Sequence, residues 1–68
     1  MANYYVNTNP QPNGDHEVHV AGCSWFPEQR HAKYLGDFAY CSGAVAAAKL
    51  IYPSADGCYY CSPSCNTR

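Results

Sequence analysis

The sequence has little charge and no long hydrophobic run. Charged residues make up 13% of the 68 residues, and the formal net charge at pH 7 is −1. The few lysines and arginines are scattered, so the basic cluster that usually meets a phosphate backbone is missing. The longest apolar stretch, 44–52, is interrupted by Lys49 and is shorter than the about 20 residues that cross a bilayer. The composition therefore predicts no membrane span and makes nucleic acid a less favoured partner.

Features of a secreted protein are also lacking. The opening segment, MANYYVNTN, has no basic start, no apolar core and no small-residue cleavage site of a signal peptide. Five cysteines are many for this length, but their odd number would leave one thiol over in a disulfide framework. In a reducing compartment, thiolates that hold a metal ion are favoured. We therefore expect a cytoplasmic protein with a metal site, and disulfides are the alternative.

A chain this short needs a cross-link. Sixty-eight residues form one domain at most, and a hydrophobic core of this size rarely contributes more than about 3–5 kcal/mol. We expect a single domain, 1–68, that consists of an arm and loop over 1–15, a core over 16–61 and a tail over 62–68. A metal ion would supply the missing stability.

The pattern of residues predicts a small α+β domain. Alternating, β-branched residues predict a strand over 17–20, and a second strand follows over 34–38. Residues 4–6 form either a further short strand or an arm. We expect the strands 17–20 and 34–38 to pair in an antiparallel sheet. An alanine-rich helix over 42–52, with Ser42 as its N-cap and Pro53 after its end, would pack on that sheet.

Four residues are typical of a structural zinc site. The CxxC motif formed by Cys58 and Cys61 lets the chain turn back and present both sulfurs to one tetrahedral ion. His19 and Cys23 form a second pair at the end of the first predicted strand. Four such ligands leave no open position for a water molecule, which indicates a structural Zn²⁺ and not a catalytic one. Cys65 is the alternative ligand, in place of His19 or Cys23.

The other cysteine and histidines have simpler interpretations. Cys41, just before the predicted helix, is expected to be a small buried apolar residue rather than a reactive thiolate. His16 and His31 are expected at the surface. A thiol-disulfide redox protein that uses the CxxC motif is less favoured, because redox motifs place the first cysteine at the start of a helix. Here the motif follows a helix and a turn, and Pro63 discourages a new helix.

Aromatic residues are abundant, at 15% of the chain, and seven of them are tyrosines. Most are expected to fill the small core, with the tyrosine hydroxyls at the surface. Any aromatic side chains left exposed would contact a protein partner or stack on bases.

Two resemblances extend this interpretation. The order of HVAGC (19–23), a strand over 34–38, an alanine-rich helix, Tyr52 and CYYC (58–61) resembles the Ada-like metal-binding modules of bacteria, which are small zinc domains found alone or fused to nucleases and DNA-repair proteins. The resemblance implies zinc at His19, Cys23, Cys58 and Cys61. The pattern YLG…F…AV..A…DGCYYC is similar to a group of small uncharacterised bacterial and phage proteins, which implies no activity.

The sequence therefore predicts a zinc-binding interaction module and no enzyme. A protein is the expected partner, and the alternatives are a nucleic-acid-binding zinc module and a redox protein that uses Cys58 and Cys61.

Overall fold

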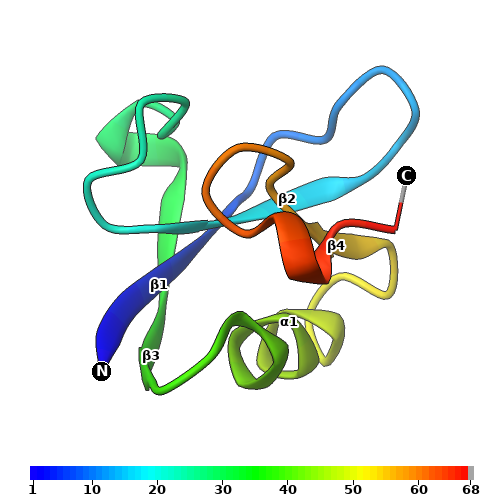
Figure 1. The fold of residues 1–68 in the computed structure, drawn as a ribbon. Coiled ribbons are helices and arrows are strands. Elements are labelled where there is room, and N and C mark those ends of the chain that lie inside the picture. Colours follow the sequence, from blue (N-terminus) through cyan, green and yellow to red (C-terminus); the bar gives the residue numbers. More distant parts are fainter. Residues whose placement is uncertain (68) are drawn as a thin grey trace.

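The computed structural model describes residues 1–67 as a four-stranded mixed sheet packed on one helix (Figure 1). This confirms the predicted α+β class. The sheet has the strand order β3-β1-β2-β4. In chain order the elements are β1 (Ala2–Asn7), β2 (His16–Val20), the 3-10 turn η1 (Gln29–His31), β3 (Ala32–Phe38), α1 (Cys41–Lys49), β4 (Ala55–Gly57) and the 3-10 turn η2 (Pro63–Cys65).

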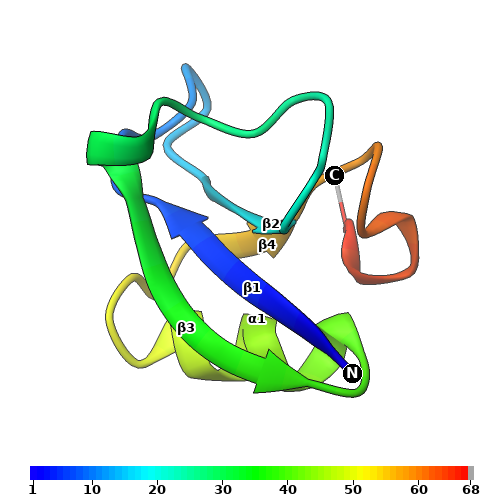
Figure 2. The ribbon, with the colours of Figure 1, turned by 90° about the vertical axis from the view of Figure 1, so that its left-hand side faces the viewer.

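The strand β1 lies inside the sheet, although the sequence left it open whether 4–6 is a strand or an arm. It pairs antiparallel with β2 on one side and with β3 on the other (Figure 2). The predicted direct pairing of 17–20 with 34–38 is therefore wrong. The physical reason lies in β1 itself, where Tyr4 and Val6 alternate toward the core and are both buried, as inner-strand residues commonly are.

The strand β4 was not predicted, because Ala-Asp-Gly has the composition of a turn. It pairs parallel with β2, from His16 opposite Ala55 to Val18 opposite Gly57. Gly57 is needed here for a close approach: a Cβ at this position would lie 2.7 Å from the Cβ of Cys65 and 2.8 Å from the carbonyl oxygen of Ser62. The missing side chain therefore lets the last segment of the chain fold back directly over β4.

The helix is shorter than predicted. It spans Cys41–Lys49 and not 42–52, and its N-cap residue is Tyr40, without a side-chain capping bond, so Ser42 is not the cap. At the other end, the amides of Leu50 and Ile51 donate to carbonyl oxygens three residues back, at 3.2 and 2.9 Å. This tightening into 3-10 geometry ends the α-helix ahead of the next proline.

The core lies between α1 and one face of the sheet. Val6 and Val18 from the sheet meet Ala44 and Ala48 from the helix, and all four are fully buried. Small alanine side chains let the helix axis approach the sheet closely, but they bury little apolar area. The core is therefore small, as the length of the chain requires.

The opposite face of the sheet carries the residues of interest. Successive side chains of a strand point to opposite faces, so Val18 faces the helix while Glu17 and His19 face away from it. The long connection between β2 and β3 and the turn over 58–62 after β4 lie on this other side (Figures 1 and 2), whereas η2 returns to the start of α1. Phe26 of that connection packs against Tyr5, with ring centroids 5.1 Å apart.

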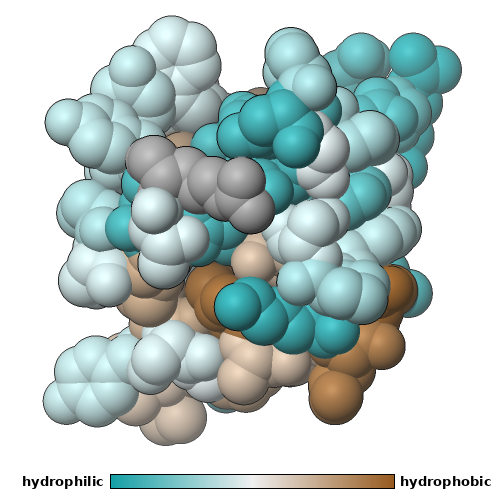
Figure 3. Space-filling model, turned by 90° about the vertical axis from the view of Figure 1, so that its right-hand side faces the viewer, coloured by the Kyte–Doolittle hydropathy of each residue, from teal (hydrophilic) through white to brown (hydrophobic). Residues whose placement is uncertain are grey.

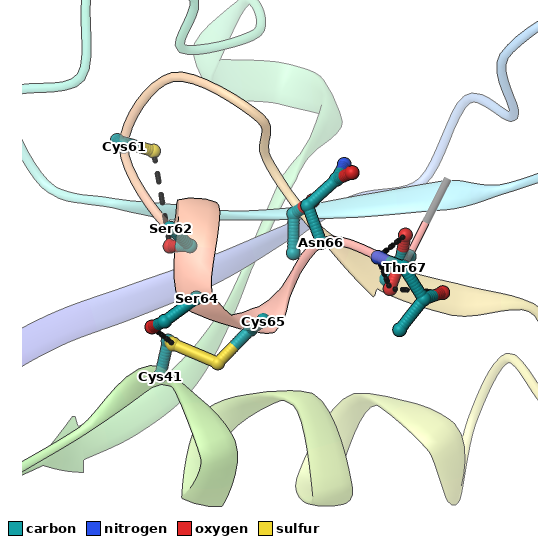
Figure 4. The surroundings of a disulfide bond; sticks show 9 residues. Cys41, Cys61, Ser62, Ser64, Cys65, Asn66 and Thr67 are labelled. Carbon is teal, nitrogen blue, oxygen red and sulfur yellow. Dashed lines mark hydrogen bonds between the residues drawn. A yellow bond between two sulfur atoms is a disulfide. The ribbon is translucent and has the colours of Figure 1, made fainter.

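A disulfide and hydrogen bonds attach the C-terminal segment to α1 and β4. Cys65 on η2 forms a disulfide with Cys41 at the start of α1 (Figure 4). The amide of Thr67 donates to the Asp56 carboxylate at 2.9 Å, and its hydroxyl donates to the same group at 3.1 Å. Residue 68 of the predicted tail lies outside the described residues. The expectation that Cys41 is buried is confirmed, but it is joined in a disulfide that was not predicted, because the fold brings η2 back over the helix.

The helix α1 of the described chain is too short to cross a membrane.

In the view of Figure 3 the hydrophobic residues gather along the lower part of the surface, over α1, and the upper part is mostly hydrophilic. Leu50 and Ile51, at the end of α1, are exposed.

Candidate metal centre

The first half of the centre is built where β2 ends. His19 is the penultimate residue of this strand and is 1% exposed. A tight turn follows, in which the amide of Cys23 donates to the carbonyl of Val20 at 3.1 Å and Gly22 has φ of +89°. Such a positive φ in a turn favours glycine. The turn reverses the chain and places Cys23 beside His19.

The second half is built where β4 ends. The amide of Cys58 donates to the carbonyl of Val18 at 2.9 Å, which continues the β2–β4 pairing by one residue. The chain then turns, and the amide of Ser62 donates back to the carbonyl of Cys58 at 2.9 Å. This turn carries Cys61. Because β4 lies next to β2, the two turns face each other across neighbouring strand ends.

The four side chains come together closely enough to hold a metal ion. The ligand atoms of His19, Cys23, Cys58 and Cys61 all lie within 4.8 Å of one another. The sulfurs of Cys23 and Cys58 are 4.0 Å apart, and Nδ1 of His19 is 3.8 Å from the sulfur of Cys61. A tetrahedral zinc ion separates two thiolates by about 3.8 Å and a thiolate from an imidazole nitrogen by about 3.5 Å. The donor set and its spacing therefore fit such an ion.

Burial affects the protonation of His19 and Cys61 when no metal is bound. Burial raises the pKa of the Cys61 thiol to about 12, and hydrogen bonds with the neighbouring thiols of Cys23 and Cys58 raise it as well. Burial also lowers the pKa of His19, so its imidazole is neutral at pH 7 and has a lone pair for a metal. A metal ion must displace the thiol protons, since only thiolates are strong ligands.

Glu17 is a residue of the site that the sequence analysis missed. Its Oε1 lies 3.5 Å from Nε2 of His19, without the alignment of a hydrogen bond. Nε2 is buried and has no other partner among residues 1–67. Burial has the largest effect on Glu17 and raises the pKa of its carboxyl group. A hydrogen bond from Gln11 lowers this pKa, and the nearby negative charges of Asp56 and Asp15 raise it. The spacing in the sequence could have indicated it, because Glu17 and His19 are two residues apart in a predicted strand and such residues lie on the same face.

Substitution Glu17→Ala is expected to weaken metal binding about 10–100-fold, the usual effect of removing a group that orients a histidine ligand. When Nδ1 binds the metal, the ring proton is on Nε2, where Glu17 is the one acceptor within reach among residues 1–67. Competition with a chromophoric zinc chelator measures the affinity.

The matched control for this experiment is Glu28→Ala. Glu28 is a well-exposed carboxylate whose ion pair with Arg30, at 3.7 Å, is also exposed, so its removal should leave the affinity unchanged. Equal affinities of the Glu17 variant and the wild type would show that the carboxylate does not orient His19.

The remaining predicted candidates lie elsewhere. The disulfide with Cys41 takes up the thiol of Cys65, which is not among the four clustered ligands. His16 is half-buried rather than solvated, stacked on Tyr52 with ring centroids 3.8 Å apart and with Nδ1 2.9 Å from the carbonyl oxygen of Asn7. His31 is half-buried on the η1 turn.

Exposed aromatic side chains surround the centre. Trp25 follows the first turn, and Tyr59 and Tyr60 lie between the two cysteines of the second. The rings of Trp25 and Tyr60 stack with centroids 4.7 Å apart, and Tyr59 meets Tyr60 edge-on at 5.2 Å. All three are more than half exposed. The prediction that aromatic residues mainly fill the core does not hold for them.

The sequence resemblance to Ada-like modules stays a prediction. Comparison with protein-family models, with curated proteins and with solved structures finds no match for this chain.

Proposed function

We propose that this chain is a structural zinc-binding domain, without enzymatic activity, that binds a protein partner. The observation that carries the proposal is the cluster of one imidazole nitrogen and three sulfurs within 4.8 Å. Each half of the cluster comes from a tight turn at a strand end. An ion held there would join the β2–β3 connection to the segment after β4.

The donor set favours zinc. Three thiolates and one imidazole are typical of closed, four-coordinate structural zinc sites. Calcium and magnesium prefer oxygen ligands, and the cluster offers none. The four ligands occupy all the tetrahedral positions, so a zinc ion here would have no position for a substrate or an activated water.

A redox function is less favoured by the same geometry. A redox-active CxxC motif depends on a thiol with a lowered pKa at a helix N-terminus. Here Cys58, the first cysteine of the motif, directly follows the strand β4 and does not lie at the N-terminus of a helix. The CxxC motif is therefore better suited to hold a metal than to attack a disulfide.

The disulfide accounts for the odd cysteine count. Two cysteines pair, and the three others remain free to bind a metal ion. A cytoplasmic location remains a prediction, against which the Cys41–Cys65 disulfide weighs, since such bonds are rare in the cytosol.

Native mass spectrometry tests the proposal. The protein, purified without added metal or chelator, is expected to carry one zinc ion per chain, and Cys58→Ser is expected to carry none. Thiol counting on the same sample should find three cysteines that react with an alkylating reagent only after chelation. Metal-free protein with these three thiols reactive from the start would contradict the proposal.

A further inference from the structure

We propose that the Cys41–Cys65 disulfide controls how tightly the domain holds zinc, and that a dithiol reductant weakens zinc binding by attacking the sulfur of Cys65. This inference rests on the zinc-binding function proposed above. Two structural features carry it. The disulfide is attached to the same segment that carries two of the proposed metal ligands, and a hollow in the surface opens onto Cys65.

The disulfide lies one short turn away from the proposed metal ligands. Figure 4 shows Ser62 between Cys61 and the η2 turn that carries Cys65. The amide of Ser62, which is 2% exposed, donates to the carbonyl of Cys58 at 2.9 Å, and the amide of Cys65 donates to the carbonyl of Ser62 at 3.0 Å. The two turns therefore share Ser62, and the disulfide attaches to α1 the segment that carries Cys58 and Cys61.

The disulfide strengthens zinc binding through its effect on the unfolded chain. Because the core is small, we expect the metal-free chain to unfold, so that zinc binding is coupled to folding. A cross-link between two cysteines 24 residues apart restricts the conformations of the unfolded chain and makes folding more favourable. Reduction removes this restriction, and for a loop of that length the apparent affinity for zinc should fall about 100-fold.

The sulfur of Cys65 is the accessible one of the pair. Cys65 is half-buried and lines a hollow of about 350 Å³ between α1 and the C-terminal segment. Cys41 is 8% exposed and is not part of this lining. Since thiol-disulfide exchange depends on access to the sulfur that is attacked, an incoming thiolate reaches Cys65 first.

The other sulfur is placed to leave. Cys41 is the first residue of the nine-residue helix α1, whose first turn contains no acidic side chain. The N-terminus of a helix stabilises a thiolate, and exchange is faster when the departing thiolate is stabilised. The position of Cys41 therefore favours cleavage in the direction that the accessibility of Cys65 indicates.

The reaction is a two-electron reduction by a dithiol. The first thiolate of the reductant bonds to the sulfur of Cys65, the S–S bond breaks, and its electron pair goes to the sulfur of Cys41. The second thiol of the reductant then displaces Cys65 from the mixed disulfide. The protein gains two electrons and two protons as two thiols, and the reductant leaves as its own disulfide.

Zinc affinity in the two redox states tests the proposal. Wild-type protein is compared before and after treatment with dithiothreitol, which is removed by gel filtration under nitrogen, and competition with a chromophoric chelator measures the affinity. We expect the reduced protein to bind zinc about 100-fold more weakly. The matched control is Cys41→Ala combined with Cys65→Ala, which should show the weaker affinity whether or not it has been treated with the reductant.

Thermodynamic linkage requires the reverse effect, in which zinc protects the disulfide. A 100-fold difference in affinity corresponds to a reduction potential that saturating zinc lowers by about 60 mV, because a factor of ten is about 30 mV for a two-electron couple. Equilibration in glutathione buffers, followed by acid quenching and peptide mapping of the Cys41–Cys65 pair, measures this shift. In zinc-loaded protein, the mixed disulfide with glutathione should be found on Cys65.

Equal zinc affinities of the oxidised and the reduced wild type would overturn this inference alone. Five reactive thiols in chelated protein that has met no reductant would also overturn it, since no disulfide would then exist. A mixed disulfide on Cys41 would overturn the assignment of Cys65 as the point of attack. A wild type that binds no zinc in either redox state would overturn the zinc-binding function, and this inference with it.

Discussion

Chelation of the metal ion is expected to unfold the domain even while the Cys41–Cys65 disulfide is intact. Structural zinc contributes about 10–16 kcal/mol of apparent binding free energy in comparable small sites, whereas a core of this size contributes about 3–5 kcal/mol. The fully buried side chains on the helix are alanines, so packing cannot replace the ion. Circular dichroism and the dispersion of amide proton NMR signals, with and without EDTA, measure the loss of fold.

The substitution Cys58→Ser should reproduce the effect of chelation, because Cys58 is the buried sulfur that joins the end of β4 to the cluster. Ser24→Ala is the matched control: it changes an exposed residue directly after the ligand Cys23 and should leave the spectrum unchanged. Zinc added back after removal of EDTA should restore the fold. A chelated protein that keeps dispersed signals and a cooperative thermal transition would contradict a structural role for the metal.

Removal of the disulfide is expected to lower the free energy of unfolding by about 3 kcal/mol while the zinc site is kept. The two cysteines are 24 residues apart in the sequence, and a cross-link over a loop of that length raises the free energy of the unfolded state by about this much, because it restricts the conformations of that state. The suitable variant is Cys41→Ala combined with Cys65→Ala. Urea denaturation in the presence of zinc measures the loss.

The same variant distinguishes the two possible roles of Cys65. A residue that serves only in the disulfide leaves the zinc stoichiometry at one per chain, whereas loss of zinc would identify Cys65 as a ligand. Wild-type protein treated with a phosphine reductant should show the same decrease in stability as the double variant. Identical stability of the wild type and the variant would mean that the two cysteines are not joined in solution.

The grouping of the four candidate ligands could be predicted because the spacing within each pair is local. A histidine and a cysteine around a glycine turn, and two cysteines two residues apart, each fix a pair of ligands within one turn of the chain. The structure brings the four residues together. Glu17 could not be predicted with the same ease, because its approach to His19 depends on which face of β2 is covered.

The sheet was less predictable, for a different reason. The strand β1 is followed by a loop rich in asparagine and proline, which resembles an arm, and its inner position depends on pairing with residues far away in the sequence. The strand β4 has three residues with low strand propensity, and only its backbone pairs with β2. Disulfide connectivity likewise cannot be deduced from a count of cysteines.

The position of the last segment of the chain determines when the domain can fold during synthesis. Both the disulfide and the proposed metal cross-link need this segment, since it supplies Cys65 to the former and Cys58 and Cys61 to the latter. A nascent chain with β1, β2, β3 and α1 already synthesised still lacks β4 and both cross-links, so it cannot complete the fold. The domain therefore cannot fold element by element in chain order, because residues 55–65 complete the sheet, the disulfide and the proposed metal site together.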